Sequence, residues 1–303
     1  MKPTTSPPAR TGAVTRRTGL LAATAALLSG CSASGALDRL IARDTYSGQP
    51  DIGYGADARQ RLDVSQPTVA APAQGFPVVL FFYGGNWTRG DRAGYRFVGE
   101  ALAANGVLAI VADYRLSPQV RYDGALRDCA LATRWVFEQA QGFGGDLTRV
   151  MLMGHSAGAY NAAMLALDPR WLRDVGLQPS RLAGWIGLAG PYDFLPIGDP
   201  EVQLAFGWPN TPADSQPIAH AGAKAPRTLL IAGLRDRVVD PQRSTASLAR
   251  LLRAAGTEVH ERLLNGLGHV AVMAAMARPL DWLAPVLPTV LAFARGESLD
   301  AGG

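Results

Sequence analysis

The chain has 303 residues, of which 48% are hydrophobic and 18% charged, and this length and composition suit one well-buried, enzyme-sized domain. Its net charge of +4 arises from Lys2, Arg10, Arg16 and Arg17, so the balance beyond residue 30 is zero (+4 − 4 = 0). This distribution argues against the clustered basic face of a nucleic-acid-binding protein, and we expect no nucleic-acid partner.

Residues 1–30 have the order of an export signal, with a charged start, an apolar stretch over 20–28 and then small residues. The apolar stretch is shorter than the ~20 residues of a membrane-spanning helix. The pair Arg16-Arg17 also resembles a twin-arginine export signal, although adjacent arginines suit general secretion as well.

The segment Leu28-Ser29-Gly30-Cys31 resembles the lipobox of bacterial lipoproteins. In those proteins the cysteine becomes the diacylated first residue of the mature chain, so we expect lipid on Cys31. The protein would then be anchored to a membrane of the bacterial cell envelope, on its periplasmic or extracellular side. A plain cleaved signal with an incidental cysteine is the alternative. Residues 31–50, rich in Ser, Ala and Gly, are predicted to form a tether.

Residues 51–296 are predicted to form the catalytic domain, followed by a flexible tail over 297–303. Apolar runs of strand length alternate with amphipathic segments of helix length, which predicts an α/β fold with a mostly parallel sheet covered on both faces. The predicted strands are 78–82, 107–112, 150–153, 185–188, 228–232 and 259–264, and the predicted helices are 122–141, 157–167 and 242–255.

Two further features concern the interior and the surface of this domain. Cys129 falls in a helical pattern and is predicted to be a small buried residue, because two cysteines are too few for a disulfide scaffold. Residues 191–226 are rich in Pro, Gly, Asp and Asn and lack a long periodic stretch. We expect either a small lid over a site or a plain surface excursion there.

The motif Gly154-His155-Ser156-Ala157-Gly158 stands between a predicted strand and a predicted helix. This is G-x-S-x-G in the strand-turn-helix setting of a nucleophile elbow, where glycines relieve the crowding of a sharp turn. Ser156 is therefore the predicted nucleophile. His155 occupies a variable position of the motif and is not the predicted base.

A serine hydroxyl needs a base to take its proton, and an acid must orient that base. His269, in a glycine-rich segment directly after the last predicted strand, is the predicted base; His220 lies in the irregular segment and His260 inside a strand. Asp236 follows the strand 228–232 and is the predicted acid, since catalytic groups gather at the carboxyl edge of parallel sheets. Its rivals are Asp240 and Asp193.

Acyl transfer also needs N–H donors for the tetrahedral oxyanion. The segment Tyr83-Gly84-Gly85-Asn86-Trp87 follows the strand 78–82, and its small residues expose backbone N–H groups. We expect the oxyanion hole to consist of the N–H groups of Gly85, Asn86 and Ala157; an ordinary glycine turn is the alternative. The side chains of Trp87 and Tyr160 are candidates either for the pocket wall or for the core.

Over about residues 50–295 these motifs together resemble the esterase and lipase branch of the α/β-hydrolase superfamily, particularly the hormone-sensitive-lipase-like and feruloyl-esterase-like carboxylesterases and the kynurenine formamidases. The segment Asp113-Tyr114-Arg115-Leu116-Ser117-Pro118 matches the Asp-Tyr-Arg-Leu-x-Pro motif of those families. Tyr83 departs from their pattern, because it stands where they have a histidine, and Asn86 takes the place of their third glycine.

The resemblance and the residues together predict hydrolysis of a small-molecule carboxylic ester by Ser156, His269 and Asp236 through an acyl-enzyme. This mechanism requires no metal and no organic cofactor. A formamidase would use the same three residues on an amide, and a non-catalytic binding protein on the same fold is a further alternative.

Overall fold

The structure is a computed structural model that describes residues 44–299, and within that range eight strands form one sheet in the order β1-β2-β4-β3-β5-β6-β7-β8. β1 pairs antiparallel with β2, and β2 with β4, whereas all other neighbours run parallel. The mostly parallel sheet that the sequence predicts is therefore confirmed. The strands are β1 Tyr46–Gly53, β2 Arg61–Pro67, β3 Phe76–Phe82, β4 Leu108–Ala112, β5 Gly145–His155, β6 Gly184–Leu188, β7 Thr228–Gly233 and β8 Val259–Leu264.

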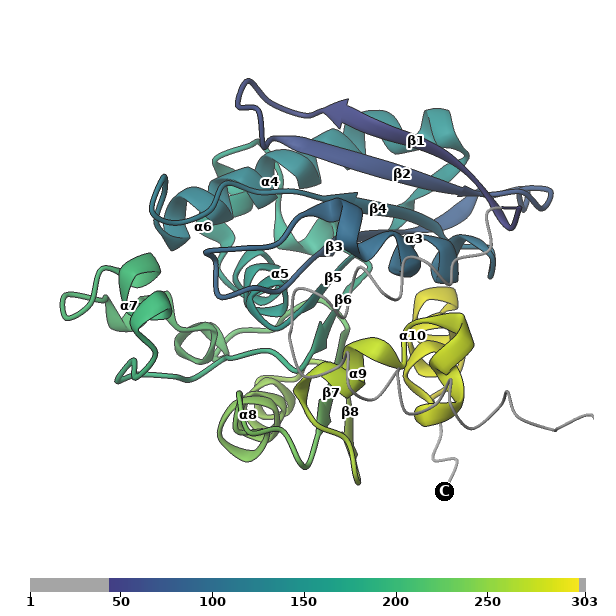
Figure 1. The fold of residues 1–303 in the computed structure, drawn as a ribbon. Coiled ribbons are helices and arrows are strands. Elements are labelled where there is room, and N and C mark those ends of the chain that lie inside the picture. Colours follow the sequence, from purple (N-terminus) through teal and green to yellow (C-terminus); the bar gives the residue numbers. More distant parts are fainter. Residues whose placement is uncertain (1–43, 300–303) are drawn as a thin grey trace, which may run out of the picture.

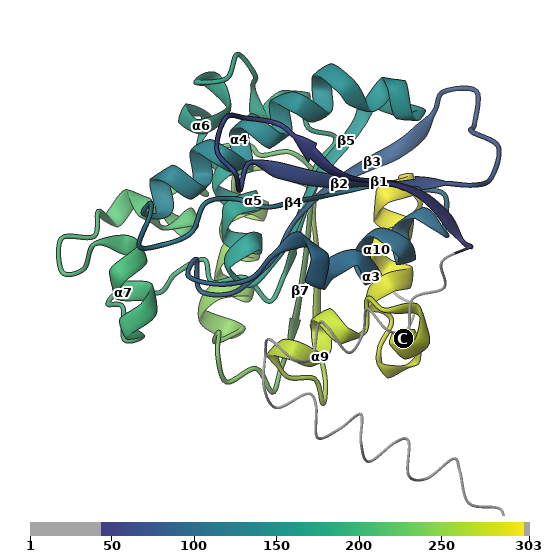
Figure 2. The same ribbon diagram turned by 45° about the horizontal axis from the view of Figure 1, so that its top comes forward.

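Helices cover both faces of the sheet, with α3 and α10 on one side and α4, α5 and α8 on the other (Figures 1 and 2). The predicted helix 242–255 begins with a π-helical turn, Gln242–Ala246, before α8. The helices are α3 Arg96–Ala103, α4 Tyr122–Gln139, α5 Ala157–Leu167, α6 Pro169–Arg173, α7 Pro200–Phe206, α8 Ser247–Ala254, α9 His269–Ala274 and α10 Val286–Arg295. Cys129 of α4 is fully buried, as expected.

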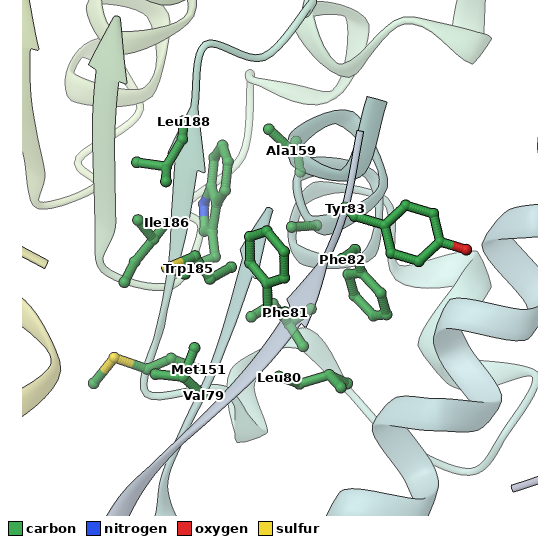
Figure 3. Packing of buried hydrophobic residues seen from close by; sticks show 14 of the residues in the cluster. Val79, Leu80, Phe81, Phe82, Tyr83, Met151, Ala159, Trp185, Ile186 and Leu188 are labelled. Atoms are coloured by element: carbon green, nitrogen blue, oxygen red, sulfur yellow. The ribbon is translucent and has the colours of Figure 1, made fainter. Parts of the chain in front are cut away.

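The central strand β3 shows why the sequence signal is strong here. All of its residues are buried, because helices cover it on both faces. Val79 and Phe81 point to one side, and Leu80 and Phe82 to the other (Figure 3). A strand with two buried faces reads as a continuous apolar run rather than an alternating one. The carboxyl ends of β3, β5 and β7 are buried in this core.

The predicted tether is wrong at its C-terminal end. Residues 46–50 belong to β1, which pairs through its backbone with β2, while residues 31–43 lie outside the described range. Most residues of β1 are exposed, so the strand carries no apolar pattern that the sequence could reveal. The first residues of the predicted tail also pack on the domain: the carbonyl of Leu299 accepts a hydrogen bond from the guanidinium of Arg262.

The segment 191–226 contains α7 and two 3₁₀ turns, Ala213–Ser215 and Pro217–His220, and α7 stands out at the margin of the molecule (Figure 1). Phe206 anchors α7 because its ring is buried against the domain. Between residues 44 and 299 the protein has no helix with the length and apolar character needed to span a bilayer.

Candidate active site

Ser156 is the single residue between the end of β5 and the start of α5, and its backbone angles are φ 54° and ψ −122°. Such a backbone conformation costs a non-glycine residue on the order of 1–3 kcal/mol and is typical of functional sites. The flanking glycines make the turn possible: a Cβ on Gly154 would overlap the backbone of Gly158, and a Cβ on Gly158 would overlap the carbonyl of Phe82. The Ser156 N–H donates to the carbonyl of Leu188, at 2.9 Å, which ties the elbow to β6.

The structure brings His269 and Asp236 together. Asp236 lies in the loop after β7, His269 is the first residue of α9 after β8, and His269 Nδ1 lies 2.7 Å from Asp236 Oδ2. The other carboxylate oxygen accepts the N–H groups of Val238, at 2.8 Å, and Val239, at 2.9 Å. Burial by itself would raise the pKa of Asp236, but the hydrogen bonds from His269 and these N–H groups outweigh it and lower the pKa below its usual range.

The rival carboxylates have other partners. Asp193 forms an ion pair with Arg243 at 3.0 Å, and Asp240 accepts the N–H groups of Gln242 and Arg243. The rival histidines are also engaged elsewhere: His260 lies 2.9 Å from a carboxylate oxygen of Glu258, and His220 lies 2.7 Å from the carbonyl oxygen of Asp214. Among these candidates, only Asp236 has a hydrogen bond with His269 within the described chain.

His155 brings the serine elbow into contact with His269. His155, the residue before the serine, has its ring centroid 4.9 Å from that of His269, and its Nε2 lies 3.3 Å from the His269 carbonyl oxygen. None of the hydrogen bonds within residues 44–299 joins Ser156 Oγ to the His269 ring. Such bonds are commonly long in free enzymes and shorten when substrate binds.

The loop after β3 passes directly over the serine. A Cβ on Gly84 would lie 2.8 Å from that of Ser156, so only glycine permits this approach. Gly85 has φ 132° and Asn86 has φ 53°, a region that asparagine tolerates better than most residues. The N–H groups of Gly85, Asn86 and Ala157 donate to no acceptor within the described chain. They therefore remain the predicted donors to an oxyanion.

Tyr83, at the start of this loop, is held by hydrogen bonds at both its hydroxyl and its carbonyl. Its hydroxyl donates to Asp113 Oδ1 at 2.8 Å and accepts from Arg59 Nη2 at 2.7 Å. Its carbonyl accepts the hydroxyl of Tyr114 at 2.7 Å, and the two rings stack at 4.9 Å. Asp113 also accepts the N–H of Arg92. Sequence reasoning missed this network, because Arg59 and Asp113 lie 24 and 30 positions from Tyr83.

Trp87 and Tyr160 belong to the core rather than to an exposed pocket wall, since both are almost fully buried. The two rings meet edge to face at 5.1 Å, and both contact Phe194 and Phe206 of the segment 191–226. The indole N–H of Trp87 donates to Asn161 Oδ1 at 3.0 Å. This aromatic cluster joins the segment 191–226 to the loop over the serine.

A polar contact reinforces that junction at the surface. The side-chain amide of Asn86 donates to Glu201 Oε2 at 3.1 Å and to Asp199 Oδ2 at 3.3 Å, and Arg89 forms an ion pair with Glu201. Asp199 caps the start of α7 by accepting the N–H of Glu201. The segment is thus fastened to Asn86, one of the predicted oxyanion donors.

Residues 44–299 contain no group of three or more His, Cys, Asp or Glu side chains that could hold a metal ion.

Comparison with known proteins finds esterases among those that this chain resembles. Residues 62–251 match the BD-FAE family. Esterase LipC of Mycobacterium tuberculosis is 30% identical over 236 residues, which are 71% of this chain and 58% of LipC. Isoprenylcysteine alpha-carbonyl methylesterase ICME of Arabidopsis thaliana is 32% identical over 152 residues, 49% of this chain and 35% of that protein. The chain thus spans little more than half the length of LipC.

Among solved structures, an inhibited esterase B from Lactobacillus rhamnosis has a similar fold, with a TM-score of 0.69 and 20% identity over 93% of this chain and 100% of that one. The strand order, the elbow at Ser156 and the match over residues 62–251 all point to the same family. The chain therefore belongs to the BD-FAE family, within the α/β-hydrolase superfamily.

Proposed function

We propose that the protein is a serine hydrolase that cleaves carboxylic esters, with Ser156 as nucleophile, His269 as general base and Asp236 as the residue that orients His269. The observation that carries the proposal is the 2.7 Å contact between His269 Nδ1 and Asp236. The strained backbone of Ser156 supports it, together with the contact of the preceding residue, His155, with His269. The names of its relatives, esterases and a methylesterase, favour ester over amide substrates.

In the first step Ser156 Oγ attacks the ester carbonyl, and His269 accepts the hydroxyl proton. Asp236 stabilises the imidazolium that forms, while the N–H groups of Gly85, Asn86 and Ala157 hold the oxyanion. When the tetrahedral intermediate collapses, the C–O bond to the alcohol breaks and His269 returns its proton to the leaving oxygen. A water molecule, deprotonated by His269, then releases the acyl group from Ser156.

A fluorophosphonate probe and p-nitrophenyl acetate hydrolysis test the proposal together. The native protein should hydrolyse the ester and become labelled at Ser156, whereas S156A should lose both activities while remaining folded. Ser247→Ala is the matched control, because Ser247 is partly exposed at the start of α8, and it should behave like the native protein. Folded native protein that neither labels nor hydrolyses p-nitrophenyl esters would refute the proposal.

The formamidase alternative is tested with the same preparation. Turnover of short p-nitrophenyl esters is compared with turnover of N-formylkynurenine. The proposal expects the ester to be the better substrate by kcat/KM, and a clear preference for the formamide would replace it with an amide hydrolase.

We also propose that Cys31 carries lipid and anchors the domain to a membrane of the cell envelope. The support is the lipobox-like segment Leu28-Ser29-Gly30-Cys31 after an export-type N-terminus; these residues lie outside the described range. Palmitate labelling and membrane association should both be lost in Cys31→Ser. Unchanged labelling would refute the anchor without touching the hydrolase proposal.

A further inference from the structure

His155 is a buried histidine with no part in the mechanism described above. It is the last residue of β5 and directly precedes Ser156. Its Nε2 lies 3.3 Å from the carbonyl oxygen of His269, and because a carbonyl only accepts, Nε2 must carry the proton in this contact. The ring also packs against the His269 ring, with 4.9 Å between centroids and 44° between planes.

The other ring nitrogen of His155 has no partner. Nδ1 is buried and makes no hydrogen bond within the described chain. It faces Gly84, where an added Cβ would lie 3.2 Å from it. A buried polar atom without a partner costs stability, so an apolar side chain of similar size would suit this position better if packing were its only task. The imidazole also makes a hydrogen bond with the carbonyl of His269, which an apolar side chain could not make.

The imidazole of His155 is uncharged, which suits its position beside the proposed base, His269. Burial lowers the pKa of His155, and repulsion from His269 lowers it further, to about 3, although the hydrogen bond with the His269 carbonyl and the charge of Asp236 oppose the shift. The ring is therefore neutral at the pH at which esterases are assayed. A neutral neighbour leaves His269 free to become positively charged when it accepts the serine proton, whereas a second imidazolium would oppose that step.

We propose that His155 is a positioning residue for the catalytic base. Its Nε2–H bond fixes the backbone of His269, at the first turn of α9, to the residue that directly precedes the nucleophile. The distance between Ser156 Oγ and the His269 ring is thus set by one short connection rather than through the whole sheet. The inference rests on the proposed function, since it assigns His155 a role in the same reaction.

Gln and Met substitutions separate positioning from packing, because the two side chains have similar length and only Gln has an N–H donor. His155→Met should lower kcat for p-nitrophenyl acetate by about 10- to 100-fold, as expected when a reacting pair is displaced by up to ~1 Å. KM should stay within about twofold, and the rate of fluorophosphonate labelling should fall in parallel with kcat. His155→Gln should restore kcat to within about threefold of the native value.

His155→Phe is a second donor-less variant that keeps a flat ring, and it should resemble the Met variant in kcat. His260→Gln is the matched control, because that histidine lies on β8 and contacts Glu258 and Phe293 rather than the site. It should leave kcat unchanged. Thermal unfolding of each variant is measured alongside, so that loss of folded protein is separated from loss of turnover.

Equal kcat in the native, Met and Phe proteins would overturn the positioning role, and so would a Gln variant as slow as the folded Met variant. A native protein that neither labels nor hydrolyses would instead refute the proposed function itself. The two failures are therefore distinguishable in one set of assays.

Discussion

Replacing Tyr83 by phenylalanine removes a single hydroxyl from beneath the loop that carries the predicted oxyanion donors. The ring is fully buried and keeps its stacking on Tyr114, so the change deletes hydrogen bonds without opening a large cavity. Two bonds are lost, one to the carboxylate of Asp113 and one from the guanidinium of Arg59.

The expected magnitude follows from these partners. A hydrogen bond to a charged group contributes about 1.5–3 kcal/mol. Asp113 Oδ1 still accepts the N–H of Arg92 at 2.8 Å, and Arg59 Nη2 still donates to the carbonyl of Gly90 at 2.8 Å, so neither partner is left alone. Arg59 is also about one-third exposed, which lets water replace part of the loss. We therefore expect Tyr83→Phe to lower the free energy of unfolding by about 2–3 kcal/mol.

Turnover should fall as well, because Tyr83 directly precedes Gly84 and the loop over Ser156. We expect kcat to decrease by about 10-fold, which is less than the 100- to 1000-fold cost of deleting an oxyanion donor, since the N–H groups remain and only their support is weakened. Urea denaturation measures the first effect, and initial rates with p-nitrophenyl acetate at saturating concentration measure the second.

Tyr192 provides the matched control. Its hydroxyl is buried but makes no hydrogen bond within the described chain, so Tyr192→Phe should leave the free energy of unfolding unchanged or raise it, with unaltered kcat. If Tyr83→Phe proved as harmless as Tyr192→Phe in both measurements, the anchoring role of the Tyr83 hydroxyl would be refuted.

Three further outcomes are expected. Asp236→Asn should lower kcat by about 10⁴-fold because the base loses its orienting acid. The folded state lowers the pKa of Asp236 below the usual 3.8, so the carboxylate should stabilise the fold fully above that pH and lose this effect as the pH falls through the lowered pKa. The unfolding curves of the native protein and the variant should therefore converge in acid. Glu201→Gln should change the free energy of unfolding by less than about 1 kcal/mol, because its pair with Arg89 is about half-exposed, and a larger loss in urea titration would contradict this. Gly158→Ala should fail to give soluble protein, since its Cβ would overlap the backbone of β3, whereas Gly142→Ala, with open space around the Cβ, should express normally.

The sequence predicted the elements whose burial is uniform. Strands such as 78–82 and 228–232 are covered on both faces and show as unbroken apolar runs. β1 was missed because its side chains are exposed and its stability comes from backbone pairing with β2. In β2, the alternation of buried Leu62 and Val64 was a signal that could have been used.

In the candidate site, too, some residues could be predicted from local sequence and others could not. Ser156 stands in a local motif, and His269 follows from its place after the last strand. The choice of Asp236 over Asp193 and Asp240 depends on which carboxylate reaches His269, and that is a property of three-dimensional loop geometry. The support from His155 was missed for a related reason: its contact with His269 spans 114 positions.

The junction between α7 and the loop over the serine constrains how this protein could be redesigned. Asn86 has its backbone N–H at the predicted oxyanion position and its side-chain amide on Asp199 and Glu201. A chimaera that exchanged residues 191–226 for those of a relative would replace both acceptors of that amide. A graft of the segment would therefore have to supply a carboxylate acceptor for the Asn86 amide if the loop over Ser156 is to keep this contact.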